Sequence, residues 1–228
     1  MRRNSNILIV RMVTVALLSA LGIVMMLFVK FPYPFAPWIE IEFSDITILI
    51  GYALTNFVGA LAIAIIKTLI SLFVQPVGIY YIGQLAAFLS SFTYLFCLFL
   101  SVKVFKWFKK GIKFRILAYC FIVLVNSLFM TLLNYLFITP TYLTGEYTTC
   151  FNAAAVELVE KSLGKFGTNY FTMIFVLYLP FNILKAFLNC LVYEIVFNTL
   201  FFVLLKENPT FNKYFSKSKK EENNKVSQ

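Results

Sequence analysis

Six long apolar stretches, joined by short polar connections, dominate this 228-residue sequence. A helix that crosses the hydrocarbon core of a bilayer needs about 20 apolar residues. By that criterion we expect spans at Ile7–Val29, Phe43–Phe57, Val58–Val74, Ile79–Val104, Phe114–Ile138 and Phe171–Leu205. Hydrophobic residues make up 61% of the chain, more apolar surface than a soluble domain of this length can bury. The sequence therefore predicts an all-α integral membrane protein with six transmembrane helices.

Two of these predictions depend on local sequence. The second and third stretches share about 30 residues, so we expect a tight helical hairpin that turns near Asn56 and Gly59 inside the bundle. The first stretch follows basic residues, as a signal peptide does, but it lacks a small-residue cleavage site before Lys30. We interpret it as a retained helix.

Cationic residues gather on one side of the predicted topology. Fifteen of the 20 Lys and Arg residues lie in the N-terminal arm and first turn, the connection between the fourth and fifth spans, and the C-terminal tail: Arg2, Arg3, Arg11, Lys103, Lys106, Lys109, Lys110, Lys113, Arg115, Lys206, Lys213, Lys217, Lys219, Lys220 and Lys225. Positive residues near span ends mark the cytoplasmic side. Both termini are therefore expected in the cytoplasm.

The opposite side carries six acids against three lysines, in residues 30–45 and 139–170. The net charge of +10 follows from topology and from contact with anionic lipid, so it requires no nucleic-acid partner. The last residues are rich in Lys, Glu and Asn, a composition typical of disorder. We expect one transmembrane domain over residues 1–208 and a disordered cytoplasmic tail over 209–228.

The composition also argues against several kinds of chemistry. The chain has no histidine, which excludes a histidine base and histidine-ligated zinc or haem. Gly164 and Lys165 resemble the end of a phosphate-binding loop, but Phe166 follows where Ser or Thr is required, and Val159 replaces the first Gly. The four cysteines lack the paired spacing of a disulfide framework or metal site. We expect neither an enzyme nor a metal or cofactor site.

Few polar side chains interrupt the spans, and each is a candidate functional group because polar groups are costly in a bilayer. Asn134 lies near the outer end of the fifth span; Asn182 and Lys185 share one face of the sixth. Pro180, just before them, can bend that helix around a cavity. Structural roles stay open: Asn134 as a cap or a link between helices, Lys185 as a snorkelling side chain or the partner of an acid.

The connection after the first span combines prolines, aromatic residues and acids. Residues 31–38 (FPYPFAPW) predict a stiff loop that could form a lid, and Glu42 and Asp45 follow it. Either acid could equally start the second helix. Together with the polar groups of the last two spans, these residues predict an outward-facing pocket with flat apolar walls. That set suits a neutral, planar, polyhydroxylated molecule better than an anion, which would require arginines that the outer side lacks.

At these residues the chain resembles the substrate-binding S-components of energy-coupling factor (ECF) vitamin transporters, and among them the riboflavin-specific branch. Four stretches carry the resemblance: residues 16–20 (ALLSA), 34–45 (PFAPWIEIEFSD), 133–135 (LNY) with the nearby Pro140, and 179–185 (LPFNILK). The resemblance covers most of the chain. It implies a six-helix fold with both termini in the cytoplasm.

The resemblance also implies a binding site. Asn134, Asn182 and Lys185 match positions that line the flavin pocket in the family, and Glu42 stands where the family often has Asp. We expect these four groups to bind the polar edges and ribityl hydroxyls of riboflavin. In this hypothesis aromatic residues of the loop and helices stack on the flavin ring: Trp38, Tyr81 and Tyr135.

Ala16 and Ala20 match the face of the first helix by which these proteins are thought to dock a membrane coupling subunit. Two small residues four apart let another helix approach closely. The resemblance implies a bacterial cell-membrane protein that works with this coupling (T) subunit and two cytoplasmic ATPases.

Three further features qualify the prediction. The outer loop 139–170 is longer than expected for this branch, and its amphipathic run 156–163 predicts a surface helix. Lys67 lies mid-span, where it either faces the pocket or pairs with a carboxylate. For Glu194 we expect an ion pair with Arg11, because both lie at similar depth; the alternative is a role in proton coupling, for which nothing else in the sequence provides a relay.

Other functions are consistent with parts of this sequence pattern. An S-component for another vitamin, such as thiamine or biotin, would share the fold. A stand-alone vitamin carrier would share the pocket, because sequence does not show whether the partners are obligatory. A membrane enzyme acting on lipid headgroups or prenyl chains should show clustered Asp or His residues, but here the acids are scattered.

Overall fold

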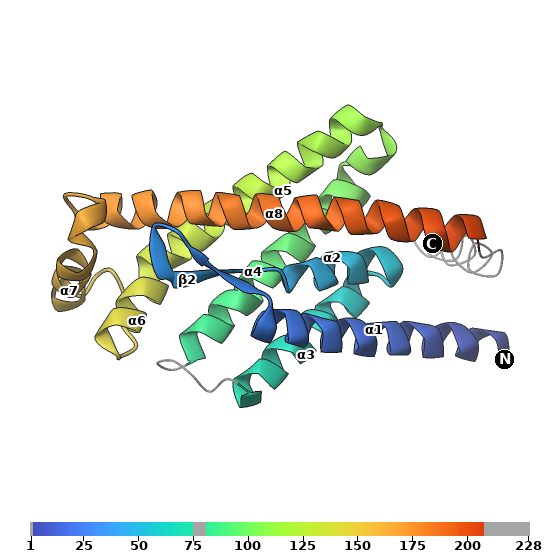
Figure 1. Ribbon diagram of the computed structural model, residues 1–228, viewed down its shortest axis with the longest axis horizontal. Coiled ribbons are helices and arrows are strands. Elements are labelled where there is room, and N and C mark those ends of the chain that lie inside the picture. The colour runs from blue at the N-terminus through green and yellow to red at the C-terminus, as the bar shows by residue number, and fades with distance from the viewer. Residues whose placement is uncertain (1, 75–80, 208–228) are drawn as a thin grey trace.

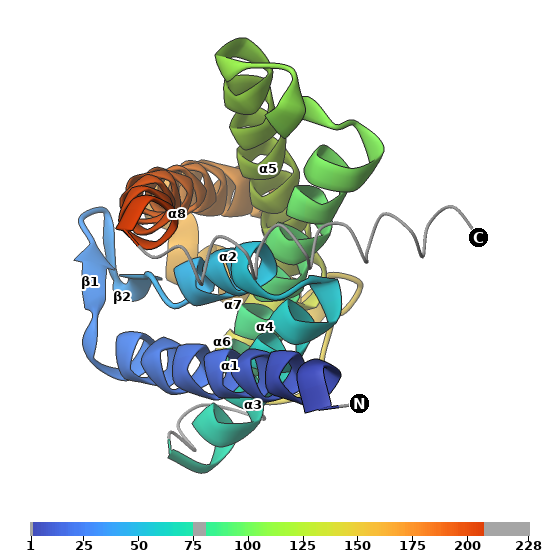
Figure 2. The same ribbon diagram turned by 90° about the vertical axis from the view of Figure 1, so that its right-hand side faces the viewer.

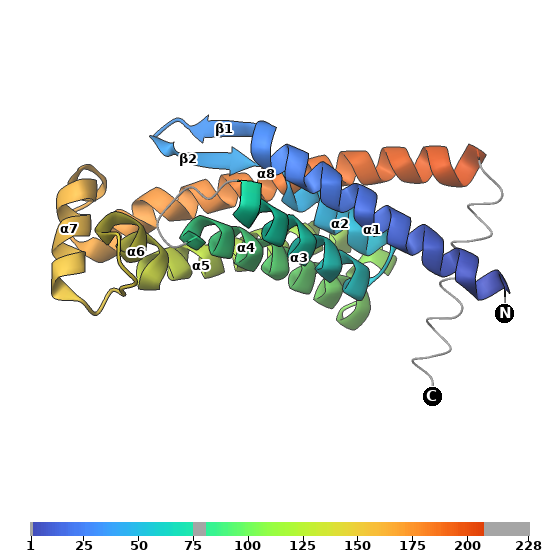
Figure 3. The same cartoon turned by 90° about the horizontal axis from the view of Figure 1, so that it is seen from below.

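The computed structural model describes residues 2–74 and 81–207, so the predicted tail over 209–228 lies outside it. Two long helices, α1 (Arg2–Phe28) and α8 (Tyr170–Glu207), run along the long axis of the bundle in opposite directions (Figure 1). The start of α1 and the end of α8 therefore lie at the same end of the molecule, as Figure 3 also shows. A β-hairpin and the short helices before α8 lie toward the other end.

Five helical segments in the described part of the chain are long and apolar enough to cross a membrane: Leu8–Phe28, Phe57–Val74, Ile82–Val104, Ile112–Thr144 and Tyr170–Thr199. The predicted span at 43–57 is instead α2 (Asp45–Leu54), a helix of 10 residues. At 1.5 Å per residue it covers about 15 Å, half of a bilayer core. By length, the structure supports five crossings and a short apolar helix rather than six crossings.

The predicted helical hairpin between α2 and α3 (Phe57–Val74) is confirmed. Thr55 ends α2 by donating a hydrogen bond from Oγ1 to the Gly51 carbonyl at 2.6 Å. Asn56 begins α3, because its Oδ1 accepts from the Gly59 amide at 2.8 Å. Most of α2 is buried between α1, α3, α4 (Ile82–Phe99) and α8. A helix too short to span the bilayer is thus enclosed by longer ones.

The proline-rich connection is a β-hairpin, a correction to the all-α prediction. Strands β1 (Lys30–Tyr33) and β2 (Ala36–Glu42) pair antiparallel, with Lys30 opposite Glu42. A proline is tolerated in a strand at an edge, and a two-stranded sheet has two edges. The Tyr33 ring packs edge-on to the Phe181 ring of α8, with the ring centres 5.3 Å apart. This packing holds the hairpin against the bundle.

The long connection before α8 contains α6 (Thr139–Thr144) and α7 (Ala153–Leu163), which confirms the predicted amphipathic helix. Asn152 caps α7 by accepting from the amides of Ala154 and Ala155. Val159 and Leu163 are buried and pack with residues of α8 in one apolar cluster. The connection is therefore an ordered cover over one end of the bundle.

Helix α4 continues as a π-helical turn (Leu100–Val104), and a 3₁₀ turn (Trp107–Lys109) leads to α5 (Ile112–Leu133). This elbow projects from the bundle, as the end-on view in Figure 2 shows. The ion pair predicted between Glu194 and Arg11 is corrected here, because the Glu194 carboxylate pairs with Arg115 of α5 and also accepts from Tyr119. The partner comes from α5 because α5 and α8 pack along each other.

Candidate functional site

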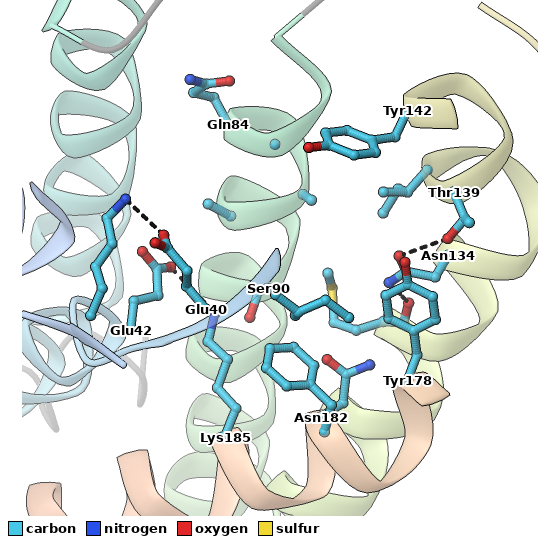
Figure 4. A pocket seen from close by; sticks show the side chains of 18 of the residues that line it. Glu40, Glu42, Gln84, Ser90, Asn134, Thr139, Tyr142, Tyr178, Asn182 and Lys185 are labelled. Atoms are coloured by element: carbon cyan, nitrogen blue, oxygen red, sulfur yellow. Dashed lines mark hydrogen bonds and ion pairs between the residues drawn. The ribbon is translucent and has the colours of Figure 1, made fainter. Parts of the chain in front are cut away.

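A cavity of about 710 Å³ lies among the β-hairpin, α4, α8 and the segment that joins α5 to α6. Figure 4 shows its polar side chains converging from these elements. The polar and charged residues in its lining are Lys30, Glu40, Glu42, Gln84, Ser90, Asn134, Thr139, Tyr142, Ser162, Tyr178, Asn182 and Lys185. Its apolar part includes Met26, Ile39, Met130, Ile138, Leu163 and Phe181. A cavity in which polar groups converge among apolar side chains is typical of a small-molecule site.

Two carboxamides lie on one wall of this cavity. Asn134 begins a π-helical turn (Asn134–Ile138), where its Nδ2 donates to the Met130 carbonyl at 2.8 Å. Its Oδ1 accepts from Thr139 Oγ1 at 3.3 Å. Asn182 of α8 donates from Nδ2 to Thr131 Oγ1 at 3.1 Å. These bonds orient both amides, and π-helical turns are frequent at functional sites because they redirect side chains.

A charged pair also lines the cavity, formed by Lys185 of α8, one turn after Asn182, and Glu42 of β2. Lys185 Nζ lies 3.3 Å from Glu42 Oε1, and both side chains are largely buried, at 13% and 12% exposure. The neighbouring turn of α8 fixes the strand that carries the acid, because Asn189 Nδ2 donates to the Glu42 carbonyl at 3.3 Å. The four polar residues predicted to bind ligand thus lie around one cavity, although they come from β2, η4 (Asn134–Ile138) and α8.

A second ion pair lies behind the first. Lys67 of α3 is fully buried and donates to Asp45 Oδ1 at 3.1 Å, to Ser44 Oγ at 2.9 Å and to Ser91 Oγ at 3.0 Å. Of the two predicted alternatives for Lys67, the structure shows pairing with a carboxylate. Asp45 is the first residue of α2, where a negative charge is also favoured by the helix dipole.

The aromatic part of the predicted site is different in the structure. Tyr135 packs against Tyr170 and Phe171 in an apolar cluster, and Tyr81 is 49% exposed where α4 begins; neither belongs to the cavity lining. The Trp38 side chain lies outside the described side chains. Rings in the lining come instead from Tyr142, Tyr178 and Phe181. Successive residues of a helix point in different directions, so the Tyr135 side chain leaves the cavity wall that holds Asn134.

Two sequence signals could have identified part of this missed lining. Tyr178 precedes Asn182 by four residues and Lys185 by seven, the spacing of one helix face. Gln84 and Ser90 are polar residues within an apolar span, which is the criterion that selected the asparagines. Tyr142 and Ser162 gave no such signal, because they reach the cavity through the path of the α6–α7 segment.

The two small residues of the predicted docking face lie on the outside of α1. Ala16 and Ala20 are exposed, as are the neighbouring Leu17 and Leu21, whereas Ser19 and Gly22 on the other face are buried. Ala16 and Ala20 therefore do not pack against other described helices of this chain. Their face is available to lipid or to another protein.

Apolar helices around a polar-lined cavity define a multi-pass membrane protein with room for a small organic ligand. Residues 10–197 match the family described as ECF transporter, substrate-specific component. The chain belongs to this family of membrane transport components.

Relatives and a solved structure agree with this assignment. The chain is 26% identical over 194 residues to the riboflavin transporter RibU of Staphylococcus aureus. That alignment covers 83% of this chain and 89% of the relative. It is also 26% identical over 192 residues to the riboflavin transporter FmnP of Bacillus subtilis, covering 82% and 90%. A solved S component of a bacterial ECF transporter superposes with a TM-score of 0.60 at 24% identity, over 83% of this chain and 94% of that one. The last match supports the fold.

Proposed function

We propose that this protein is the riboflavin-binding subunit of an ECF importer. The observation that carries the proposal is the cavity in which Glu42, Lys185, Asn134 and Asn182 converge between tyrosine and phenylalanine side chains. Amides and a charge-balanced pair can exchange several hydrogen bonds with the polar edges of a flavin and its ribityl hydroxyls. Flat apolar walls favour its ring system.

The relatives support riboflavin over other vitamins, because both proteins compared by sequence are named as riboflavin transporters. The charges of the site support a neutral ligand. Glu42 balances Lys185, and Asp45 balances Lys67, so the cluster carries no net charge to attract an anion.

Transport would then require partners. We propose that the exposed face with Ala16 and Ala20 docks a membrane coupling subunit, which in turn binds two cytoplasmic ATPases. The basic residues at the ends of the spans favour both termini in the cytoplasm, so the cavity would open toward the outside.

The decisive experiment is a titration of purified, detergent-solubilised protein with riboflavin, followed by quenching of flavin fluorescence. We expect saturable quenching that excess thiamine or biotin does not reverse. Reversal by either competitor would assign the site to that vitamin. Absence of quenching, with protein shown to be folded and free of bound flavin, would contradict the riboflavin assignment and leave the family membership intact.

A further inference from the structure

We propose that Asp45 and Lys67, which lie behind the cavity wall, determine its preference for a neutral over an anionic ligand. Asp45 is the permanent counter-charge of Lys185, and Lys67 compensates Asp45, so that the site as a whole stays neutral when ligand binds. Both are positioning residues. The inference rests on the proposed function, because it concerns how the same site distinguishes riboflavin from its phosphate ester.

The four charges alternate in sign through the protein. Lys67 Nζ lies 3.1 Å from Asp45 Oδ1, and Asp45 Oδ2 lies 4.0 Å from Lys185 Nζ. Lys185 in turn lies 3.3 Å from Glu42 at the cavity surface. The chain of charges therefore begins at a fully buried ammonium in α3 and ends at two groups that line the cavity.

Hydrogen bonds hold Asp45 in this position. Ser91 donates to Oδ1, which Lys67 also contacts, and Ser90 donates to Oδ2 at 3.4 Å. Ser90 itself lines the cavity, so one hydroxyl and the Lys185 ammonium separate Asp45 from a bound ligand. Both carboxylate oxygens of Asp45 thus accept hydrogen bonds within the protein, which fixes the side chain without any contact to a ligand.

This arrangement explains how Lys185 can serve a neutral ligand. When a ligand draws the ammonium away from Glu42, Lys185 needs a second counter-charge, because a buried charge without a partner is strongly unfavourable. Asp45 remains beside Lys185 in that event, because its own contacts come from Lys67 and two serines. Lys67 is needed because Asp45 and Glu42 would otherwise give the site a net negative charge.

The test measures one ratio in full-length protein, the Kd for flavin mononucleotide divided by the Kd for riboflavin. Where the mononucleotide binds weakly, its Kd is obtained by letting it compete with bound riboflavin. Asp45→Asn leaves the cluster with one excess positive charge, so we expect the ratio to fall. Lys67→Gln leaves one excess negative charge, so the ratio should rise. Each change should be roughly threefold to tenfold, because a unit charge acts across the cavity on the phosphate of the ligand.

Opposite changes in two variants distinguish a charge effect from structural damage, which would weaken both ligands in the same sense. Ser91→Ala is the matched control: it removes a contact to Asp45 without changing charge, and the ratio should stay at the wild-type value. The double variant Asp45→Asn/Lys67→Gln is neutral again. It should bind both flavins more weakly, because Lys185 keeps only Glu42 as a counter-charge, and the ratio should stay unchanged.

Ratios that stay constant or move in the same direction in the two single variants would overturn the inference. A changed ratio in the double variant would also overturn it. If one single variant fails to fold, the direction of the change in the other decides the question. Failure of wild-type protein to bind riboflavin would contradict the proposed function instead.

Discussion

Lys185 and Glu42 illustrate how a membrane protein tolerates charge away from water. Their 3.3 Å contact balances both groups, and the side chains remain slightly exposed to the cavity. A neutral ligand with donors and acceptors can replace part of that contact without leaving either charge alone. Asn134 and Asn182 can add directional hydrogen bonds to a ligand without placing a charge in the cavity.

Replacing Lys185 should weaken riboflavin binding. In Lys185→Met, Glu42 loses its partner and the ligand loses a donor, so we expect a loss of about 1–3 kcal/mol. Asn182→Ala should cost a similar amount, because the ligand loses the amide that Thr131 orients at the cavity surface. Fluorescence titration measures both. Leu184→Ala, on the exposed side of α8, is the control; equal affinity of all three variants would place the ligand elsewhere.

The structure also changes the predicted stacking partner. Tyr142 lines the cavity, whereas Tyr147 of the same connection is 69% exposed and outside the lining. We expect Tyr142→Ala to reduce riboflavin affinity by about 1 kcal/mol and Tyr147→Ala to leave it unchanged. Titration of the two variants at one detergent concentration provides the comparison. An effect at Tyr147 alone would contradict this assignment of the wall.

The sequence predicted some of the polar residues of the spans that line the cavity, but it did not predict which aromatic residues do. Asn134 and Asn182 are conspicuous in sequence because burial of an amide demands a reason. Tyr135 is one of many aromatic residues in a chain with 13 Tyr and 27 Phe, and its rotation about the helix axis decides which side it faces.

Helices α1, α2 and α3 pack closely through small residues. A Cβ added at Gly22 of α1 would lie 2.7 Å from Thr47 Oγ1 and 3.4 Å from Lys67 Cδ, and both side chains are fully buried. Gly22 thus lets α1 rest directly on the hairpin that carries the Asp45–Lys67 pair. The opposite face of the same helix, with Ala20, is exposed.

Two substitutions on α1 should separate folding from docking. Gly22→Leu should lower the melting temperature, because overpacking costs about 1–3 kcal/mol where neighbours cannot move. Ala20→Leu should leave the melting temperature and riboflavin affinity unchanged but reduce ATP-driven uptake by the assembled transporter. Thermal unfolding of the purified variants tests the effect on folding, and riboflavin uptake into vesicles that contain the assembled transporter tests the effect on docking. Full uptake by Ala20→Leu would place the docking face elsewhere.

The contact between α5 and α8 includes the ion pair of Arg115 and Glu194, whose side chains are 30% and 22% exposed. Because the pair is partly solvated, we expect a coupling free energy of only about 0.5–1 kcal/mol. A double-mutant cycle of Arg115→Ala, Glu194→Ala and both, followed by thermal unfolding, measures it. Additive effects of the two single changes would show that the pair does not contribute to stability.

At the scale of the whole molecule, charge separates the two ends. The hairpin, which carries Glu40 and Glu42, comes before the basic connection between α4 and α5 along the chain, and the helices place the two toward opposite ends of the bundle (Figure 1). The start of α1 and the end of α8 share one end, and the cavity lies nearer the other, beside the hairpin and α6. Such polarity suits a subunit that captures ligand on one side of a membrane.

The proposed orientation can be tested in intact cells. With the natural cysteines replaced, we expect Glu157→Cys in α7 to react with a membrane-impermeant maleimide from outside, and Lys110→Cys in the α4–α5 connection to react after the membrane is opened. Both positions are exposed, so burial does not account for a difference. Labelling of Lys110→Cys in intact cells would reverse the orientation.

The sequence alone determined the membrane environment, the α2–α3 hairpin, the amphipathic α7 and the polar residues Asn134, Asn182, Lys185 and Glu42, because apolar length and isolated polarity are local properties. Tertiary structure decided the β-hairpin, the short α2, the partners of Lys67 and Glu194, and the rings that face the cavity. Each of these depends on which surfaces meet. The rotation of a helix and the partner of a charge follow from packing between segments far apart in the chain, and no local pattern records them.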